Sequence, residues 1–213
     1  MPASLLEDRP VAAPAARSGG PGGLAEQGDG GFGSGGIFGD PERFGLWAFL
    51  GTVSMLFVGF TSAYVVRRSG ADWRPITAPS LLWLNTALLL ASSAVLERAR
   101  RSLRAWDLPG AKAGMGATGA LGGLFVAGQW LAWRQLAGQG VYLASNPHSS
   151  FFYLLTGLHA LHLAGGLVWF AVLQAKLSRM ALMPGRDGLR LFATYWHFLA
   201  VLWVYLVFLL FVA

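Results

Sequence analysis

The sequence contains no cysteine and very few charged residues. Only 12% of its 213 residues are Asp, Glu, Lys or Arg, against roughly a quarter in an average soluble domain. The absence of cysteine excludes disulfides, thiolate metal sites and Cys-x-x-Cys-His haem attachment. A hydrophobic share of 54% beside so little charge indicates that lipid is the solvent for most of the chain.

Uncharged stretches of membrane-spanning length occur five times along the chain. A transmembrane helix needs about 20 consecutive apolar residues, whereas a membrane-spanning strand would show about ten residues of alternating polarity. The pattern therefore predicts an all-α integral membrane bundle of five transmembrane helices. The five windows, which contain no Lys, Arg, Asp or Glu, are Phe44 to Val66, Ala78 to Leu96, Ala113 to Trp133, Ser149 to Leu173 and Leu191 to Ala213.

The charges outside these windows predict how the chain is organised. Residues 1–42 hold 11 Gly and 5 Pro, so burial would not offset the entropy of ordering them. We expect a flexible cytoplasmic tail, followed by a membrane domain over residues 43–213. The connections on one side carry ten Lys and Arg and those on the other carry four, so the N-terminus should be cytoplasmic and the C-terminus at the outer face. The net charge of +6 fits anionic lipid head groups better than nucleic acid.

The third window is rich in glycine. Gly119 and Gly123 form a small-xxx-small pair, which allows two helix backbones to approach closely. Because glycine is unfavourable in an exposed helix, this density predicts a central helix that packs on more than one face. The alternative is that glycine is common in membrane helices in general. Asn85 and Gln129, the isolated amides of the second and third windows, are predicted to hydrogen-bond between helices.

Histidine is the residue type within the windows best suited to binding a metal or a haem. His159 and His162 are three residues apart and should share one helix face, while His197 lies in the last window and His148 in the loop before the fourth. The first three could hold a metal together, or they could hydrogen-bond between helices. A structural role is favoured, because no carboxylate or thiolate is nearby to complete a metal site.

Four segments of the chain resemble the cytochrome c oxidase subunit III family. Gly45 to Arg67 is similar to the third helix of that family and Leu81 to Ser93 to its fourth. Phe152 to Val168 resembles the sixth helix and Tyr195 to Trp203 the seventh. The motif residues of the last two segments, which the resemblance implies are structural, are Thr156, Gly157, His159, His162, Tyr195, Trp196 and His197. The resemblance runs from Arg43 to the C-terminus and matches a five-helix form without the first two of seven helices.

The resemblance implies a non-catalytic accessory subunit of a haem-copper respiratory oxidase in a bacterial cell (inner) membrane. Such a subunit packs beside the catalytic subunit I in a complex that includes subunit II. It contacts membrane lipids, holds structural phospholipid, and sustains proton-coupled oxygen reduction in aerobic electron transport. This chain would bind no cofactor itself, and haem and copper would belong to its partners. Two acids usual in the family are absent, since Val53 and Ala200 occupy their positions; no role of those acids is carried over.

Other interpretations stay open at this point. The chain could be an accessory subunit of a nitric oxide reductase, a quinol oxidase or a respiratory supercomplex. It could also be a b-type cytochrome, in which His159 or His162 pairs with His197 across a haem. A transporter is disfavoured, because the windows contain no Asp, Glu, Lys or Arg along which ions or protons could pass.

Overall fold

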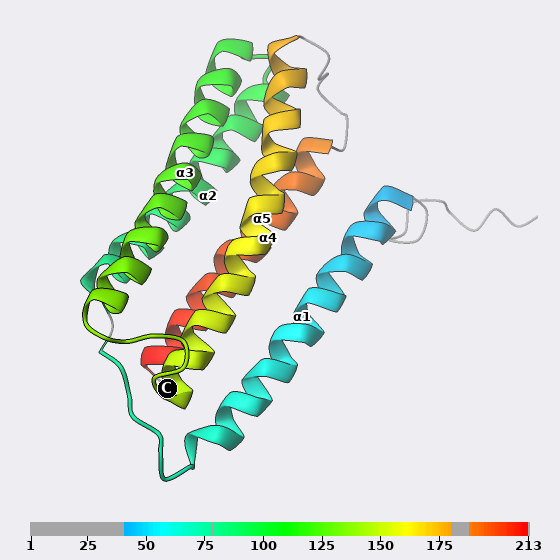
Figure 1. Cartoon of the computed structure of the whole chain (residues 1–213). Helices are drawn as coiled ribbons and strands as arrows, with labels where there is room; N and C mark the ends of the chain where they lie inside the picture. The colour runs from blue at the N-terminus through cyan, green and yellow to red at the C-terminus, as the bar shows by residue number, and fades with distance from the viewer. Residues whose placement is uncertain (1–40, 78, 180–187, 213) are drawn as a thin grey trace, which may run out of the picture. The chain divides into compact units, whose positions relative to one another are not determined.

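The structure, a computed structural model, describes residues 41–77, 79–179 and 188–212, and these form five α-helices (Figure 1). The helices are α1 (Pro41–Arg68), α2 (Ser80–Arg104), α3 (Leu108–Gly138), α4 (Pro147–Ser178) and α5 (Gly188–Phe211). The described residues contain no β-strand, so the prediction of an all-α fold is confirmed. The predicted tail lies outside the described residues, except for its last two residues, which begin α1.

Four of the helices, α1, α2, α4 and α5, are long and apolar enough to cross a membrane. The remaining helix, α3, is 31 residues long, but its many Gly residues and Gln129 lower its mean hydropathy. Length and composition therefore do not by themselves identify α3 as a span, although its predicted window lies within the helix.

Side-chain caps fix the start of α3 and α4. The Asp107 carboxylate accepts a hydrogen bond from the backbone N–H of Gly110 at 3.0 Å. At α4, the Asn146 side chain accepts from the Ser149 N–H at 3.1 Å, while the Ser149 hydroxyl accepts from the Asn146 N–H at 3.1 Å. Proline follows the cap as the first helical residue, where its missing N–H has no consequence. This capping box makes His148 part of the first turn of α4 rather than of the preceding loop.

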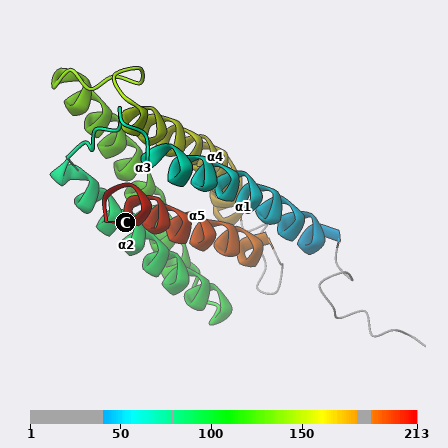
Figure 2. The same cartoon turned by 90° about the horizontal axis from the view of Figure 1, so that it is seen from below.

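The helices pack as two antiparallel pairs with α1 along one side. α2 lies against α3 and α4 against α5, and α5 also contacts α2. α1 packs on α4 and α5 but not on α2 or α3 (Figures 1 and 2). The prediction that the glycine-rich helix is central is wrong for this chain: α5 holds that place. The glycines of α3 approach Ala99 of α2, Phe170 of α4 and Trp196 of α5, so the predicted packing on more than one face is present. Trp130 and Leu131, on the remaining face of α3, are exposed.

Candidate functional site

The family-motif residues lie on the facing helices α4 and α5. Tyr195 of α5 donates its hydroxyl proton to the backbone carbonyl of His162 at 2.7 Å. The Tyr195 ring also lies 3.0 Å from the point where a side chain on Gly166 would begin. A close backbone approach and a direct hydrogen bond thus join the two helices at the motif. These contacts give the motif a role in helix packing.

His159 is enclosed in the aromatic core. It is fully buried, with the Phe125 ring of α3 at 6.2 Å and the Trp203 ring of α5 at 5.1 Å between centroids. Neither ring nitrogen has a hydrogen-bond partner among the described residues. An imidazole in such apolar surroundings is held by van der Waals and ring contacts rather than by polar ones.

His162 faces a different neighbour. Its Nδ1 lies 2.8 Å from the carbonyl oxygen of Leu158, one turn earlier on α4, so Nδ1 carries the proton and donates it. Its ring packs against Phe49 and Phe57 of α1, with centroids 6.2 and 6.0 Å away. His162 therefore contacts α1, whereas His159 contacts α3 and α5.

His197 points toward α2, away from both histidines of α4. Its Nδ1 lies 2.7 Å from the hydroxyl oxygen of Ser93, and its Nε2 lies 3.9 Å from a carboxylate oxygen of Glu97. Glu97 in turn pairs with Arg100 at 2.6 Å and with Arg101 at 3.6 Å on its own helix. His159, His162 and His197 therefore face different neighbours and do not converge on one site. In the described part of the chain, no group of three or more His, Asp or Glu could hold a metal ion.

Indole and hydroxyl groups tie the other motif residues between helices. Trp196 donates from Nε1 to the Ser92 hydroxyl of α2 at 3.0 Å. Trp133 of α3 donates to the Thr156 hydroxyl of α4 at 3.2 Å, and Thr156 donates to the Phe152 carbonyl at 2.6 Å. Gly157, by contrast, has nothing within 4 Å of the point where a side chain would begin. Its place in the motif has no packing explanation within the described chain.

The glycines of α3 differ in what they face. A Cβ on Gly119 would lie 2.5 Å from the Phe170 ring of α4, whereas one on Gly123 would meet nothing within 4 Å. Packing at Gly123 therefore stays a prediction that needs a partner outside the described residues. Three further glycines of α3, which the spacing of Gly119 and Gly123 does not predict, also face close neighbours: Gly114 faces Ala99, Gly122 faces Trp196 and Gly128 faces Asn85.

The predicted amide contact between α2 and α3 is present. Asn85 donates from Nδ2 to Gln129 Oε1 at 3.5 Å, and both side chains are buried. The other amide atoms of the pair, Asn85 Oδ1 and Gln129 Nε2, have no partner among the described residues. Gly128 provides the notch for this pair, since any side chain there would collide with the Asn85 amide.

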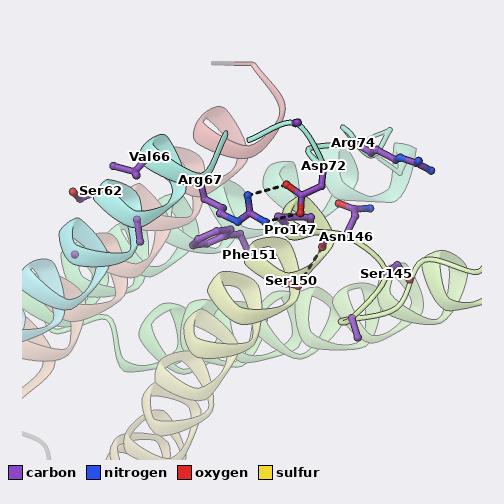
Figure 3. A pocket seen from close by; sticks show the side chains of 14 residues that line it. Ser62, Val66, Arg67, Asp72, Arg74, Ser145, Asn146, Pro147, Ser150 and Phe151 are labelled. Carbon is purple, nitrogen blue, oxygen red and sulfur yellow. Dashed lines mark hydrogen bonds and ion pairs between the residues drawn. The ribbon is translucent and has the colours of Figure 1, made fainter. Parts of the chain in front are cut away.

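Two of the clefts that border α1 lie at its opposite ends. A cleft of about 1200 Å³ lies at its C-terminal end, between the α1–α2 and α3–α4 connections (Figure 3). There Arg67 donates two hydrogen bonds to Asp72, at 2.8 and 2.5 Å, and these bonds hold the pKa of the Asp72 carboxyl below its usual value. A second groove, of about 610 Å³, runs between α1 and the α4–α5 pair at the other end. It is lined mainly by apolar side chains, with Glu42 and Lys176 as its charged members.

This arrangement defines a helical membrane protein whose polar side chains are used between helices. The sequence matches the family described as cytochrome c oxidase subunit III over residues 40–213; the chain belongs to that family.

Individual relatives agree with the family match. Cytochrome c oxidase subunit 3 of Synechocystis sp. is 33% identical over 178 residues, which cover 78% of this chain and 73% of the relative. Cytochrome c oxidase subunit 3 of Thermostichus vulcanus is 29% identical over 81% of this chain and 88% of the relative. Cytochrome bo(3) ubiquinol oxidase subunit 3 of Pseudomonas aeruginosa is 28% identical over 76% of this chain and 79% of the relative.

Proposed function

We propose that this chain is the accessory subunit III of a haem-copper respiratory oxidase. The observation that carries the proposal is the family match over residues 40–213, and the motif geometry supports it. Tyr195, Trp196 and Thr156 use their polar atoms in bonds between or within helices, which suits a structural subunit. In this proposal, subunits I and II are the direct partners, and they hold the haem and copper. The motif histidines of this chain orient helices and bind neither.

The proposed topology has five spans, including α3, in a bacterial cell membrane. The N-terminus is cytoplasmic and the C-terminus is at the outer face, because the basic residues gather at the opposite end from Arg67, Arg74 and Arg134. The membrane domain covers residues 43–213.

The absence of native cysteine makes the topology directly testable. Ala105→Cys lies in the α2–α3 connection and Ala144→Cys in the α3–α4 connection, and both positions are exposed. A membrane-impermeant maleimide applied to intact cells should label Ala144→Cys, and should label Ala105→Cys only after the membrane is opened. Equal labelling of the two positions would mean that α3 does not cross the membrane.

The groove between α1 and the α4–α5 pair is the proposed place for a structural phospholipid. Its apolar lining, which includes Phe49 and Trp169, suits an acyl chain, and Lys176 and Glu42 at the helix ends offer charges of both signs to a head group. Lys176→Gln with Glu42→Gln should reduce the phospholipid retained after purification, measured by mass spectrometry. Arg134→Gln, at the other end of the bundle, is the matched control.

The assignment as an accessory subunit is tested by isolating the chain with its partners. A tagged chain should be purified in mild detergent from its native membrane, and a reduced-minus-oxidised spectrum recorded with identification of the partners. We expect co-purification with a catalytic oxidase subunit that holds all of the haem. Recovery of the chain alone with its own haem would instead indicate a b-type cytochrome.

A quinol oxidase is the second candidate for the complex. The relative from Pseudomonas aeruginosa is a subunit of a ubiquinol oxidase, and its identity to this chain is close to that of the cytochrome c oxidase relatives. The purified complex should therefore be assayed with reduced cytochrome c and with ubiquinol in parallel. Oxidation of one donor and not of the other decides between them.

A further inference from the structure

His148 joins three separate elements at the end of the bundle where α1 finishes. The backbone N–H of Ile76, in the α1–α2 connection, donates to its Nδ1 at 2.9 Å. Its Nε2 lies 3.1 Å from the backbone carbonyl oxygen of Leu210 in the last turn of α5. The ring is 2% exposed and stacks on Trp73, with centroids 5.0 Å apart and an interplanar angle of 23°.

These two partners fix the protonation of the ring. A backbone N–H can only donate and a backbone carbonyl can only accept. Nδ1 must therefore present its lone pair to Ile76, and Nε2 must carry the proton that is donated to Leu210. The bonded ring is the neutral Nε2–H tautomer, and the Leu210 carbonyl is one of the helix-end carbonyls that need a donor from outside the helix.

We propose that His148 is a protonation-sensitive latch: the neutral ring holds the α1–α2 connection against the end of α5, and a second proton on the ring releases that connection. The second proton can bind only at Nδ1, which would then face the Ile76 N–H donor to donor. The hydrogen bond to Ile76 and the charge on the ring are therefore mutually exclusive, whatever the remainder of the site contributes.

The surroundings of the ring favour its neutral form in the latched state. From α1, the groups that face it are the Tyr64 ring, at 6.2 Å between centroids, and the charge of Arg68. Trp73 covers it from the α1–α2 connection and Phe211 from α5, at 5.0 and 6.0 Å between centroids. Among the described groups that face it, a positive charge on the ring would meet the charge of Arg68 and the surrounding aromatic rings. A pocket of about 570 Å³ lined by Arg68, Trp73 and His148 gives a proton a route to the ring.

The size of the effect follows from linkage. A released ring in water has the ordinary histidine pKa of about 6.5, and the latched ring does not accept the proton. The equilibrium constant for release is therefore nearly independent of pH well above that value and increases as the pH falls below it. Between about pH 7.5 and about pH 5, the equilibrium constant for release rises roughly thirtyfold. In the proposed topology, this end of the bundle faces the compartment that a proton-pumping oxidase acidifies. This link between the latch and proton pumping rests on the proposed function, whereas the latch itself does not.

Hydrogen exchange of the Ile76 amide measures the latch. The full chain is placed in lipid nanodiscs, and exchange is recorded at the two pH values and corrected for the intrinsic effect of pH. We expect the protection of Ile76 to fall by roughly thirtyfold at the lower pH in the wild type. His148→Asn places an amide oxygen, which does not titrate, near the position of Nδ1, and should keep Ile76 protected at both pH values. His148→Phe keeps the stacking surface but has no acceptor, and should leave Ile76 unprotected at both.

In the exchange experiment, two results would overturn the proposal: constant protection of Ile76 in the wild type, or an equal loss of protection in His148→Asn. If His148→Asn does not fold, nitrogen NMR of the labelled histidines in the wild type provides the second measurement. The His148 ring should be the Nε2–H tautomer at neutral pH, and its protonation should coincide with the loss of Ile76 protection. Protonation of the ring while Ile76 stays protected would refute the latch, and neither result depends on the orientation of the chain or on its partner.

Discussion

Gly128 and Gly123 offer a matched test of how α3 packs. A Cβ on Gly128 would collide with the amide oxygen of Asn85 and lie 3.0 Å from its amide carbon, whereas a Cβ on Gly123 would meet nothing within 4 Å. Both glycines are in the interior of the same helix. Gly128→Ala and Gly123→Ala therefore make the same chemical change in two different environments.

The expected magnitudes are separate enough to measure. Replacing Gly by Ala within a helix gains at most about 1 kcal/mol at either position. At Gly128, overpacking of the buried Asn85 amide costs about 1–3 kcal/mol, and disturbing its bond to Gln129 costs about 0.6 kcal/mol more. Gly123→Ala should therefore be neutral or slightly stabilising, and Gly128→Ala should lower the free energy of unfolding by about 1–3 kcal/mol.

The assay is equilibrium unfolding in mixed micelles, followed by the fluorescence of the nine tryptophans. The same two glycine changes are then made in an Asn85→Ala background, where the steric cost of Gly128→Ala should disappear, since the colliding group is gone. Equal stability of the two single variants would refute the reasoning, because α3 would then not approach α2 through Gly128. An undiminished cost in the Asn85→Ala background would mean that the clash lies elsewhere.

Three further predictions follow from single contacts. A double-mutant cycle of Trp196→Phe and Ser92→Ala should give a coupling free energy of about 0.6–1.7 kcal/mol in the same unfolding assay; additive effects would mean that their bond at 3.0 Å contributes nothing. His159→Phe should be neutral or stabilising in thermal denaturation, because it removes a buried group with no polar partner among the described residues, and a large loss of stability would contradict this account of the site. Since Arg67 lowers the pKa of Asp72, the stability that the pair contributes is present above the unfolded-state pKa of about 4 and is lost as the pH falls through the lower folded-state value. The difference in melting temperature between Asp72→Asn and the wild type should disappear over that acidic range, and a difference that persists below it would come from another interaction.

Helix positions were the part of the fold that sequence could predict. Long uncharged windows are rarely anything but helices in a membrane, so each predicted window overlaps one of the five helices, although the helices end at other residues. The arrangement of those helices was less accessible. Glycine density shows that a backbone approaches another closely, but not on how many faces. Gly122 contacts α4 and α5, and Gly128 contacts α2. The opposite face of α3 is uncovered, and the central helix is α5, which contacts α1, α2 and α4.

The histidines show the same limit at the level of side chains. A spacing of three places His159 and His162 near each other along α4, but it does not determine which neighbouring helix each ring contacts. Those partners depend on the positions of α1, α3 and α5, which are far away in the sequence. His148 was assigned to a loop although a signal was available: the preceding Asn146-Pro147 pair is a typical cap and first helical residue. Its partners Ile76 and Leu210 are 72 and 62 residues away, beyond the reach of any local pattern.

The residues at the two positions where the family usually carries acids fit the packing of this chain. Val53 and Ala200 are each 3% exposed, and Val53 lies on the face of α1 that is buried. A carboxylate at such depth is unfavourable by about 2.5–3.5 kcal/mol unless it finds a partner. Apolar residues there leave these buried positions without a charge to compensate. The proposed support of oxygen reduction by this chain therefore does not depend on a carboxylate at either position. It depends instead on the packing of the five helices and on the lipid and partner subunits that they are proposed to contact.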